Sequence, residues 1–332
     1  MIKKLFTFLT VLTFLSAGAA SAEILPPETP APARYHEAPE ETPEPPMILD
    51  ATRNASCLDG LRFRLDTKLL HIWFPIIANA DEAVIVYGDE VWLIDCGDKG
   101  MGLRGVRLLE ELGVTKIDRL FNTHPHHDHL GGLQVTNEAA PVGELCICFP
   151  EDSTDTMIAA MEYVNEANIP LRTYGDGDVF TMKDGKVSLK FFCPDDESLD
   201  MNNSSALSLL EYGSRRMLFM ADMERSGQEA VLASRSSEEL HAEIIKYPHH
   251  GKSGLLDAFY EAIRPSFAIV TNVYVDWGGI EYLNWKQVPF IFTCTHDAYV
   301  HLYTDGSTWV VERVPINQVT PLFPKADADQ QN

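Results

Sequence analysis

The sequence predicts an α/β fold in which helices cover the faces of a β-sheet. Short apolar runs rich in β-branched residues alternate with segments of helical spacing from about residue 68 onward. Turn-forming pairs such as Gly88-Asp89 and Gly213-Ser214 separate neighbouring runs. The 332 residues are 45% hydrophobic and 23% charged, which is an ordinary balance for a globular protein with a large core.

Each element follows from its own residues. Apolar runs of strand length occupy 69–77, 83–87, 91–95, 117–122, 142–149, 186–192, 206–212, 216–220, 242–247, 267–271, 299–304 and 308–314. Helical spacing predicts helices over 103–112, 155–167, 225–233 and 255–263, and Gly113 ends the first of them. The last two strands form a hairpin around Asp305-Gly306. The strand over 117–122 leads directly into a His-rich loop.

The first 22 residues have the features of a secretory signal peptide. Lys3 and Lys4 precede an apolar run over 5–15, and Ala20-Ser21-Ala22 follows it. We expect residues 1–22 to be removed on export, so that the protein is secreted or held in the cell envelope. An uncleaved N-terminal anchor is the alternative. The apolar run is too short to cross a bilayer, which takes about 20 helical residues, so no transmembrane segment is expected after cleavage.

Residues 23–50 are expected to form a disordered spacer. They hold eight of the 20 prolines and seven acidic residues, and such a segment buries too little apolar surface to offset the entropy lost on ordering. The folded domain is therefore expected over 51–332.

Charge and cysteine content exclude several protein classes. The formal net charge is −23, which argues against a protein that coats nucleic acid or anionic lipid through Lys and Arg. It does not exclude an enzyme whose metal ions supply local positive charge. The six cysteines are even in number, but they lack the paired spacing of a zinc knuckle. Most lie in apolar runs, where a free buried thiol is the simpler interpretation, and no bridge is assigned from sequence.

One loop carries the chemistry. Four of the eleven histidines fall within residues 124–129, in the order His124, His126, His127, Asp128, His129. The loop follows a buried strand, and α/β proteins place their sites at such strand ends. Imidazole and carboxylate are the ligands that hold Zn, Mn or Fe. The first two histidines of H-x-H-x-D-H can bind one ion and the Asp and last His a second, at the ~3.5–4 Å separation of two-metal hydrolases.

This motif resembles the signature of the metallo-β-lactamase fold superfamily. Three further segments are similar to that family: 91–97, whose strand ends in Asp95; 217–222, whose strand ends in Asp222; and 243–251, whose strand ends in His249-His250-Gly251. The resemblance implies a four-layer αββα sandwich, with two packed mixed sheets and helices outside. The doublet and the closing hairpin resemble the extracellular hydrolase domain of competence protein ComEC and its free-standing relatives, which include phosphorylcholine esterases.

The resemblance also assigns roles and implies two divalent ions, Zn or Mn. It implies that His124 and His126 bind the first ion. Asp128, His129 and one of His249 or His250 bind the second ion, and Asp222 binds both. Asp95 orients a ligand from behind, and Asn203 supports the first ion. Asp128 or a metal-bound water passes a proton to the leaving group, so Asp128 and Asp222 are the expected catalytic residues.

Alternatives stay open at several positions. Taken alone, Asp222 would cap a helix over 223–233, and His249-His250 would be a pair of surface residues. Lys252 is placed to contact a phosphate, and the alternative is that it is solvated. His127 is expected to point away. The superfamily gives its first ion a third His, and here the corresponding stretch offers Asn202 and Asn203. Asp81 has a counterpart in the family.

Three functions compete at this stage. The favoured one is a secreted, metal-dependent phosphodiesterase acting on a small-molecule, choline or nucleotide phosphoester. The second is a hydrolase of esters, lactones or amides, including β-lactams. The third is a non-catalytic binding module on the same fold, against which the complete motif argues. The oligomeric state does not follow from the sequence.

Overall fold

The computed structural model describes residues 48–59, 61, 68–100, 102–274 and 277–323. The expected signal peptide and residues 23–47 of the expected spacer lie outside these ranges. Among the described residues, none of the helices combines the length and the apolar character that spanning a membrane requires.

The first sheet has nine strands, and its middle supplies half of the site. Their spatial order is β1-β16-β15-β2-β3-β4-β5-β6-β7. The bounds are β1 Ile48–Asp50, β2 Leu70–Phe74, β3 Ala83–Tyr87, β4 Glu90–Ile94, β5 Arg119–Phe121, β6 Leu145–Ile147, β7 Leu171–Thr173, β15 Ala298–Thr304 and β16 Trp309–Pro315. Strands β4 to β7 run parallel, whereas β16, β15, β2, β3 and β4 pair antiparallel in turn.

The second sheet has seven strands in the order β14-β13-β12-β11-β10-β9-β8. The bounds are β8 Val179–Thr181, β9 Val187–Phe192, β10 Leu207–Tyr212, β11 Arg215–Phe219, β12 Ile244–Lys246, β13 Phe267–Val270 and β14 Phe290–Phe292. Strands β11 to β14 run parallel, and β8 to β11 pair antiparallel. Each sheet therefore combines an antiparallel part with a parallel part.

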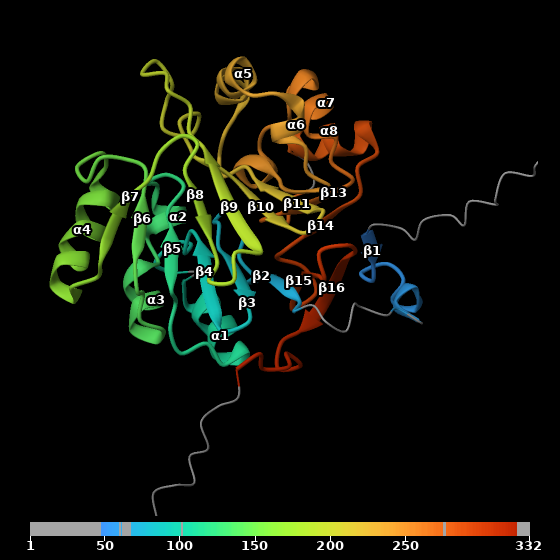
Figure 1. Ribbon diagram of the computed structural model, residues 1–332, viewed down its shortest axis with the longest axis horizontal. Coiled ribbons are helices and arrows are strands. Elements are labelled where there is room, and N and C mark those ends of the chain that lie inside the picture. The colour runs from blue at the N-terminus through green and yellow to red at the C-terminus, as the bar shows by residue number, and fades with distance from the viewer. Residues whose placement is uncertain (1–47, 60, 62–67, 101, 275–276, 324–332) are drawn as a thin grey trace, which may run out of the picture. The chain divides into compact units, whose positions relative to one another are not determined.

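Three apolar cores separate four layers (Figure 1). The helices are α1 Gly102–Leu112, α2 His127–Leu130, α3 Leu133–Ala139, α4 Asp155–Ala167, α5 Arg225–Ser234, α6 Ser237–Leu240, α7 Asp257–Ile263 and α8 Gly278–Lys286. Leu108 and Met157 of α1 and α4 pack on the nine-stranded sheet, and Val231 and Phe259 of α5 and α7 pack on the seven-stranded sheet. The two sheets face each other across the third core.

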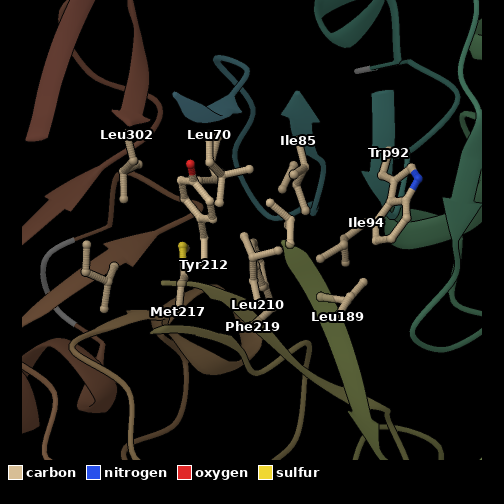
Figure 2. Packing of buried hydrophobic residues seen from close by; sticks show 14 of the residues in the cluster. Leu70, Ile85, Trp92, Ile94, Leu189, Leu210, Tyr212, Met217, Phe219 and Leu302 are labelled. Carbon is tan, nitrogen blue, oxygen red and sulfur yellow. The ribbon is translucent and has the colours of Figure 1, made fainter. Parts of the chain in front are cut away.

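The core between the sheets is made by alternate residues of facing strands. Figure 2 shows Leu70 and Ile85 of the nine-stranded sheet facing Leu210 and Phe219 of the seven-stranded sheet, and these side chains are buried. Burial of this kind stabilises the fold by about 25 cal/mol per Å² of apolar surface. The predicted αββα sandwich of two mixed sheets is confirmed.

The structure corrects one boundary of the predicted spacer. Residues 48–50 form β1, which pairs in parallel with β16 and is the edge strand of the nine-stranded sheet, with Ile48 opposite Trp309. The backbone amide of Ala51 continues the ladder to the Val311 carbonyl at 2.9 Å. Backbone hydrogen bonds to an open sheet edge order this short piece, and proline-rich composition gave no sign of them.

Candidate metal centre

Polar residues that follow strands of both sheets meet at the carboxyl ends of those strands. Asp95 follows β4, the His-rich loop follows β5, Asp222 follows β11 and His250 follows β12. These strands belong to the parallel parts of the two sheets. Because the carboxyl ends of parallel strands lie on the same side of a sheet, segments distant in sequence meet there.

The His-rich loop is tightly folded between the strands. His124 and His129 are fully buried, and His126 is the N-cap residue that precedes the short helix α2. His127 has 77% of its side chain exposed, so it points away as the sequence predicts. The turn needs glycine at position 132, because a Cβ there would lie 2.0 Å from the carbonyl oxygen of Cys96.

Asp95 holds this loop from behind. Its buried carboxylate accepts hydrogen bonds from the Thr123 amide at 2.8 Å, the Thr123 hydroxyl at 2.7 Å and the Asn122 amide group at 3.1 Å. Oδ2 also lies 2.7 Å from Nδ1 of His129. The contact to Nδ1 directs Nε2 of His129 toward the site, which is the arrangement that carboxylates give to metal-binding histidines. Burial raises the pKa of Asp95.

Asp222 lies at the centre of the site, with a different set of neighbours at each oxygen. Oδ1 is 3.2 Å from Nε2 of His129 and 3.4 Å from Nε2 of His250. Oδ2 is 3.5 Å from Nε2 of His249 and 3.9 Å from Nε2 of His124. Asp222 does not cap a helix, because α5 begins at Arg225 behind Glu224.

One group of four side chains fits a single cation. Asp128, His129, Asp222 and His250 each offer one ligand atom, and these atoms lie within 4.8 Å of one another. In the described part of the chain, Nε2 of His129, Nε2 of His250 and Oδ1 of Asp222 are buried without a hydrogen-bond partner. Buried polar atoms normally have hydrogen-bond partners. Three such atoms that converge without one are suited to act as ligands of a divalent metal ion.

His250 is fixed in place by groups on neighbouring strands. Its Nδ1 lies 3.0 Å from the Thr271 hydroxyl and 3.1 Å from Oδ1 of Asp81. Asp81 in turn accepts hydrogen bonds from Thr271 and from the buried ammonium of Lys246. His250 therefore presents Nε2 to Asp222 and to Asp128. The distance from this nitrogen to Oδ2 of Asp128 is 3.5 Å.

His249 points to the other side of Asp222. Its Nδ1 lies 2.7 Å from Oε1 of Glu224, which also accepts a hydrogen bond from the Ser253 hydroxyl. Its Nε2 lies 3.2 Å from the ammonium of Lys252. The two adjacent histidines thus face opposite oxygens of one carboxylate.

Electrostatics inside the site follow from burial and close opposite charges. Burial alone would lower the pKa of His250, but the carboxylates of Asp222 and Asp81 outweigh it and raise this pKa to about 10. Burial would raise the pKa of Asp222, and His250 and His129 hold it well below its usual value. Burial and the neighbouring imidazole of His129 hold the pKa of His124 well below its usual value, and Asp222 only partly offsets them. Asp222 is thus ionised and can supply carboxylate oxygens to a cation.

Asn203 does not join these groups through its hydrogen bonds. Its side chain donates to Asp200 and accepts from the amide of Gly227, each at 2.9 Å. It ties the loop before β10 to helix α5, so the expected support of the first ion is replaced by a structural role. Its neighbour Asn202 has a buried Oδ1 without a hydrogen-bond partner among the described residues.

Sequence reasoning missed three supporting residues: Glu224, Lys246 and Thr271. A lysine within the apolar run of β12 was an available signal, because buried lysines are rare unless paired. Glu224 and Thr271 gave none, since Glu224 is the residue before α5 and Thr271 the residue after β13, positions where polar residues are common.

Comparison with known proteins agrees with this geometry. Residues 83–147, which include β4 and the His-rich loop, match the model of the family described as Metallo-beta-lactamase superfamily. Over this segment the chain is similar to the members of that superfamily. The predicted resemblance is confirmed at this level, together with a distant similarity to a competence protein.

The superfamily match is accompanied by distant relatives. The chain is 24% identical over 187 residues to "Competence protein ComA" of Neisseria gonorrhoeae, covering 55% of this chain and 24% of that protein. The alignment thus spans about a quarter of that curated relative. The metallo-beta-lactamase fold protein YhfI from Bacillus subtilis is 12% identical, with a TM-score of 0.44 over 68% of this chain and 95% of YhfI. A metallo-beta-lactamase from Cronobacter sakazakii is 15% identical, with a TM-score of 0.33 over 44% of this chain and 54% of that one.

Proposed function

We propose that this metallo-beta-lactamase-fold hydrolase is a secreted phosphodiesterase that uses two divalent ions, Zn²⁺ or Mn²⁺. The observation that carries the proposal is the convergence of unpaired, buried imidazole and carboxylate atoms on Asp222 from both sheets. Such a set of nitrogen and oxygen donors suits these ions.

The residues divide into ligands and supports. Asp128, His129 and His250 would hold one ion, His124 and His126 the other, and Asp222 both. Bound divalent ions supply Lewis acidity and make hydroxide available at neutral pH by lowering the pKa of water. Asp95 and Asp81 keep the ring nitrogens of His129 and His250 aimed inward. Asp128, with 14% of its side chain exposed, is placed to pass a proton to a leaving group.

The surroundings support an anionic phosphoester as the substrate. The four-residue cluster contains no thiolate, and hard oxygen and nitrogen donors suit phosphate chemistry. Lys252 places an ammonium beside His249 at the rim, where it can contact a phosphate oxygen. The net charge of −23 disfavours long polynucleotides, so a small, choline-bearing or nucleotide phosphoester fits better.

A substrate panel tests this function. Purified protein is supplied in parallel with Mn²⁺ and Zn²⁺ and offered bis-p-nitrophenyl phosphate, p-nitrophenyl phosphorylcholine, a lactone and a β-lactam. We expect metal-dependent turnover of the phosphodiesters and none of the last two. Turnover of the lactone or β-lactam alone would establish the second function, and absence of bound metal after metal reconstitution would exclude the enzyme.

The double variant Asp128→Ala, His129→Ala provides the matched test of the site. It should keep the wild-type circular dichroism spectrum and lose turnover, because it removes two ligands of one ion. His127→Asn, at an exposed position of the same loop, should retain wild-type turnover. Equal turnover by the double variant and wild type would place the chemistry elsewhere.

Export is tested separately. We propose cleavage after Ala22, so mass spectrometry of protein recovered outside the cytoplasm should give an N-terminus at Glu23. Recovery only of full-length chain in the membrane fraction would support the uncleaved anchor instead.

A further inference from the structure

We propose that His249 supplies the third imidazole of the first ion, so that the adjacent residues His249 and His250 bind different ions. The inference rests on the two-ion centre proposed above. The superfamily provides this imidazole from a separate stretch, which in this chain offers only Asn202 and Asn203. The geometry points to a replacement from the neighbouring position of the other ion's ligand.

The first step is the division of Asp222 into two sides. Its Oδ1 faces His129 and His250, both members of the four-residue cluster. Its Oδ2 faces His124 and His249, at 3.9 and 3.5 Å. His126 joins this second side, because its Nδ1 is 3.1 Å from Nε2 of His124. His249 is therefore grouped with the two histidines that lack a third partner.

The second step is the backbone that separates the two rings. His249 has φ 46° and ψ 47°, and His250 has φ 54° and ψ 18°, so both lie in the left-handed region. This conformation is unfavourable for a residue with a side chain, so the surroundings must hold it there. The amide of His249 is held by the Ala221 carbonyl at 2.9 Å. The consequence is a pair of rings 5.9 Å apart and inclined by 69°, each facing its own oxygen of Asp222.

The third step is the state of the His249 ring. With Nδ1–H donating to Glu224, the free lone pair is on Nε2, on the side of Asp222. The Lys252 ammonium donates to this nitrogen at 3.2 Å. A cation already lies against the lone pair that a metal would use, and metal binding would displace it. Lys252 is then a competitor for the first ion, and Glu224 is a positioning residue.

Asn202 is the rival for this role. Its buried Oδ1 has no hydrogen-bond partner among the described residues, and an amide oxygen can bind a hard cation. The experiment must therefore separate an imidazole ligand at position 249 from an amide ligand at position 202.

The test titrates metal-free protein with Co²⁺ and records its visible absorption and the number of ions retained after dialysis. Wild type should bind two equivalents. His249→Asn and His250→Asn should each bind one, with different spectra because a different site survives. Asn202→Ala and the surface control His127→Asn should bind two. Glu224→Ala should weaken the first ion by roughly 10–100-fold, as loss of a carboxylate behind a metal-binding histidine does.

The outcomes are separable from failure of the proposed function. Two equivalents with an unchanged spectrum in His249→Asn would overturn the inference alone, as would loss of one ion in Asn202→Ala but not in His249→Asn. If wild type binds a single ion and His249→Asn leaves it unaffected, the inference also fails. No binding by wild type would end both proposals.

A second variant covers the case in which His249→Asn does not fold. Lys252→Met removes the competing cation and keeps the imidazole, so the first ion should bind more tightly while the second is unchanged. Unchanged affinity for both ions in Lys252→Met would overturn the inference independently.

Discussion

Asp95 lies behind the His-rich loop and sets its geometry through four polar contacts. Three donors of residues 122 and 123 and the ring of His129 converge on its two oxygens. A carboxylate can accept all four of these hydrogen bonds. The amide of an asparagine would instead place its NH₂ group against some of these hydrogen-bond donors. Its own backbone has φ 56°, so the residue is held in an unfavourable conformation by these contacts.

The substitution Asp95→Asn should therefore weaken metal binding without removing a ligand. We expect about a 10–100-fold loss of affinity for the ion at His129, measured by competition with a chromophoric chelator. Ser236→Ala, which removes the N-cap of α6, is a control that lowers stability by about 1 kcal/mol and leaves metal affinity unchanged. Unaltered affinity in Asp95→Asn would show that the carboxylate only stabilises the loop.

At the residue scale, the sequence predicted which segments meet but not how single rings point. The order of residues 124–129 and three strand ends located the cluster. The choice between His249 and His250 could not be made, because it depends on two successive left-handed residues that residue type does not predict. Asn203 failed for a related reason: its partners, Asp200 and Gly227, are set by the packing of α5.

At the scale of elements, α1 lies over a buried acid. A Cβ on Gly105 of α1 would lie 2.0 Å from Oε2 of Glu82, so the helix approaches the carboxyl group closely. In the described residues neither oxygen of Glu82 has a hydrogen-bond partner, and burial raises its pKa to about 8. The thiol of Cys96 interacts electrostatically with the same carboxyl group. Burial raises the pKa of this thiol most, and the charge of Glu82 raises it further.

Glu82 should make stability depend on pH. Its pKa is higher in the folded state than the ordinary 4.5, so the folded chain retains a proton that the unfolded chain releases. The contribution is complete below about pH 4.5 and is lost as pH rises through 8. Each pKa unit corresponds to about 1.4 kcal/mol, so Glu82→Gln should gain a few kcal/mol over wild type between pH 5 and pH 8.5.

Urea unfolding of both proteins in chelator, at pH 5 and pH 8.5, measures this difference. Comparing the variant with wild type cancels the titration of the histidines, which both proteins share. A constant difference between the two pH values would mean that Glu82 is ionised in the folded state across this range.

Elements with strong periodicity were predicted closely, and short ones were not. Helix α4 and strand β3 have the predicted bounds. Helix α8 and the three-residue strands β7, β8 and β14 were missed. Strand β7 is exposed along its length, so it lacks the apolar pattern on which strand prediction rests. The short strands are ordered by backbone pairing to neighbours that sequence periodicity does not reveal.

At the scale of the whole molecule, the site joins the two sheets. His124 to His129 and Asp95 belong to the nine-stranded sheet, and Asp222 and His250 to the seven-stranded one. Asp81, Asp95 and Asp222 are buried together, and bringing buried carboxylates close is unfavourable unless positive charge compensates them. In the metal-free chain the raised pKa values of His129 and His250 indicate that protonated imidazoles supply this charge.

Metal binding should therefore stabilise the entire fold rather than one loop. A ligand that binds only the folded state at 100 times its Kd adds about 2.7 kcal/mol, which raises the Tm of a domain this size by roughly 5–10 °C. Differential scanning calorimetry of chelated protein, with and without added Zn²⁺ or Mn²⁺, measures the shift. Asp222→Asn should fold and show a much smaller shift, because the carboxylate shared by both sides of the site is gone. A shift of equal size in Asp222→Asn would mean that the stabilising ion binds away from the junction between the sheets.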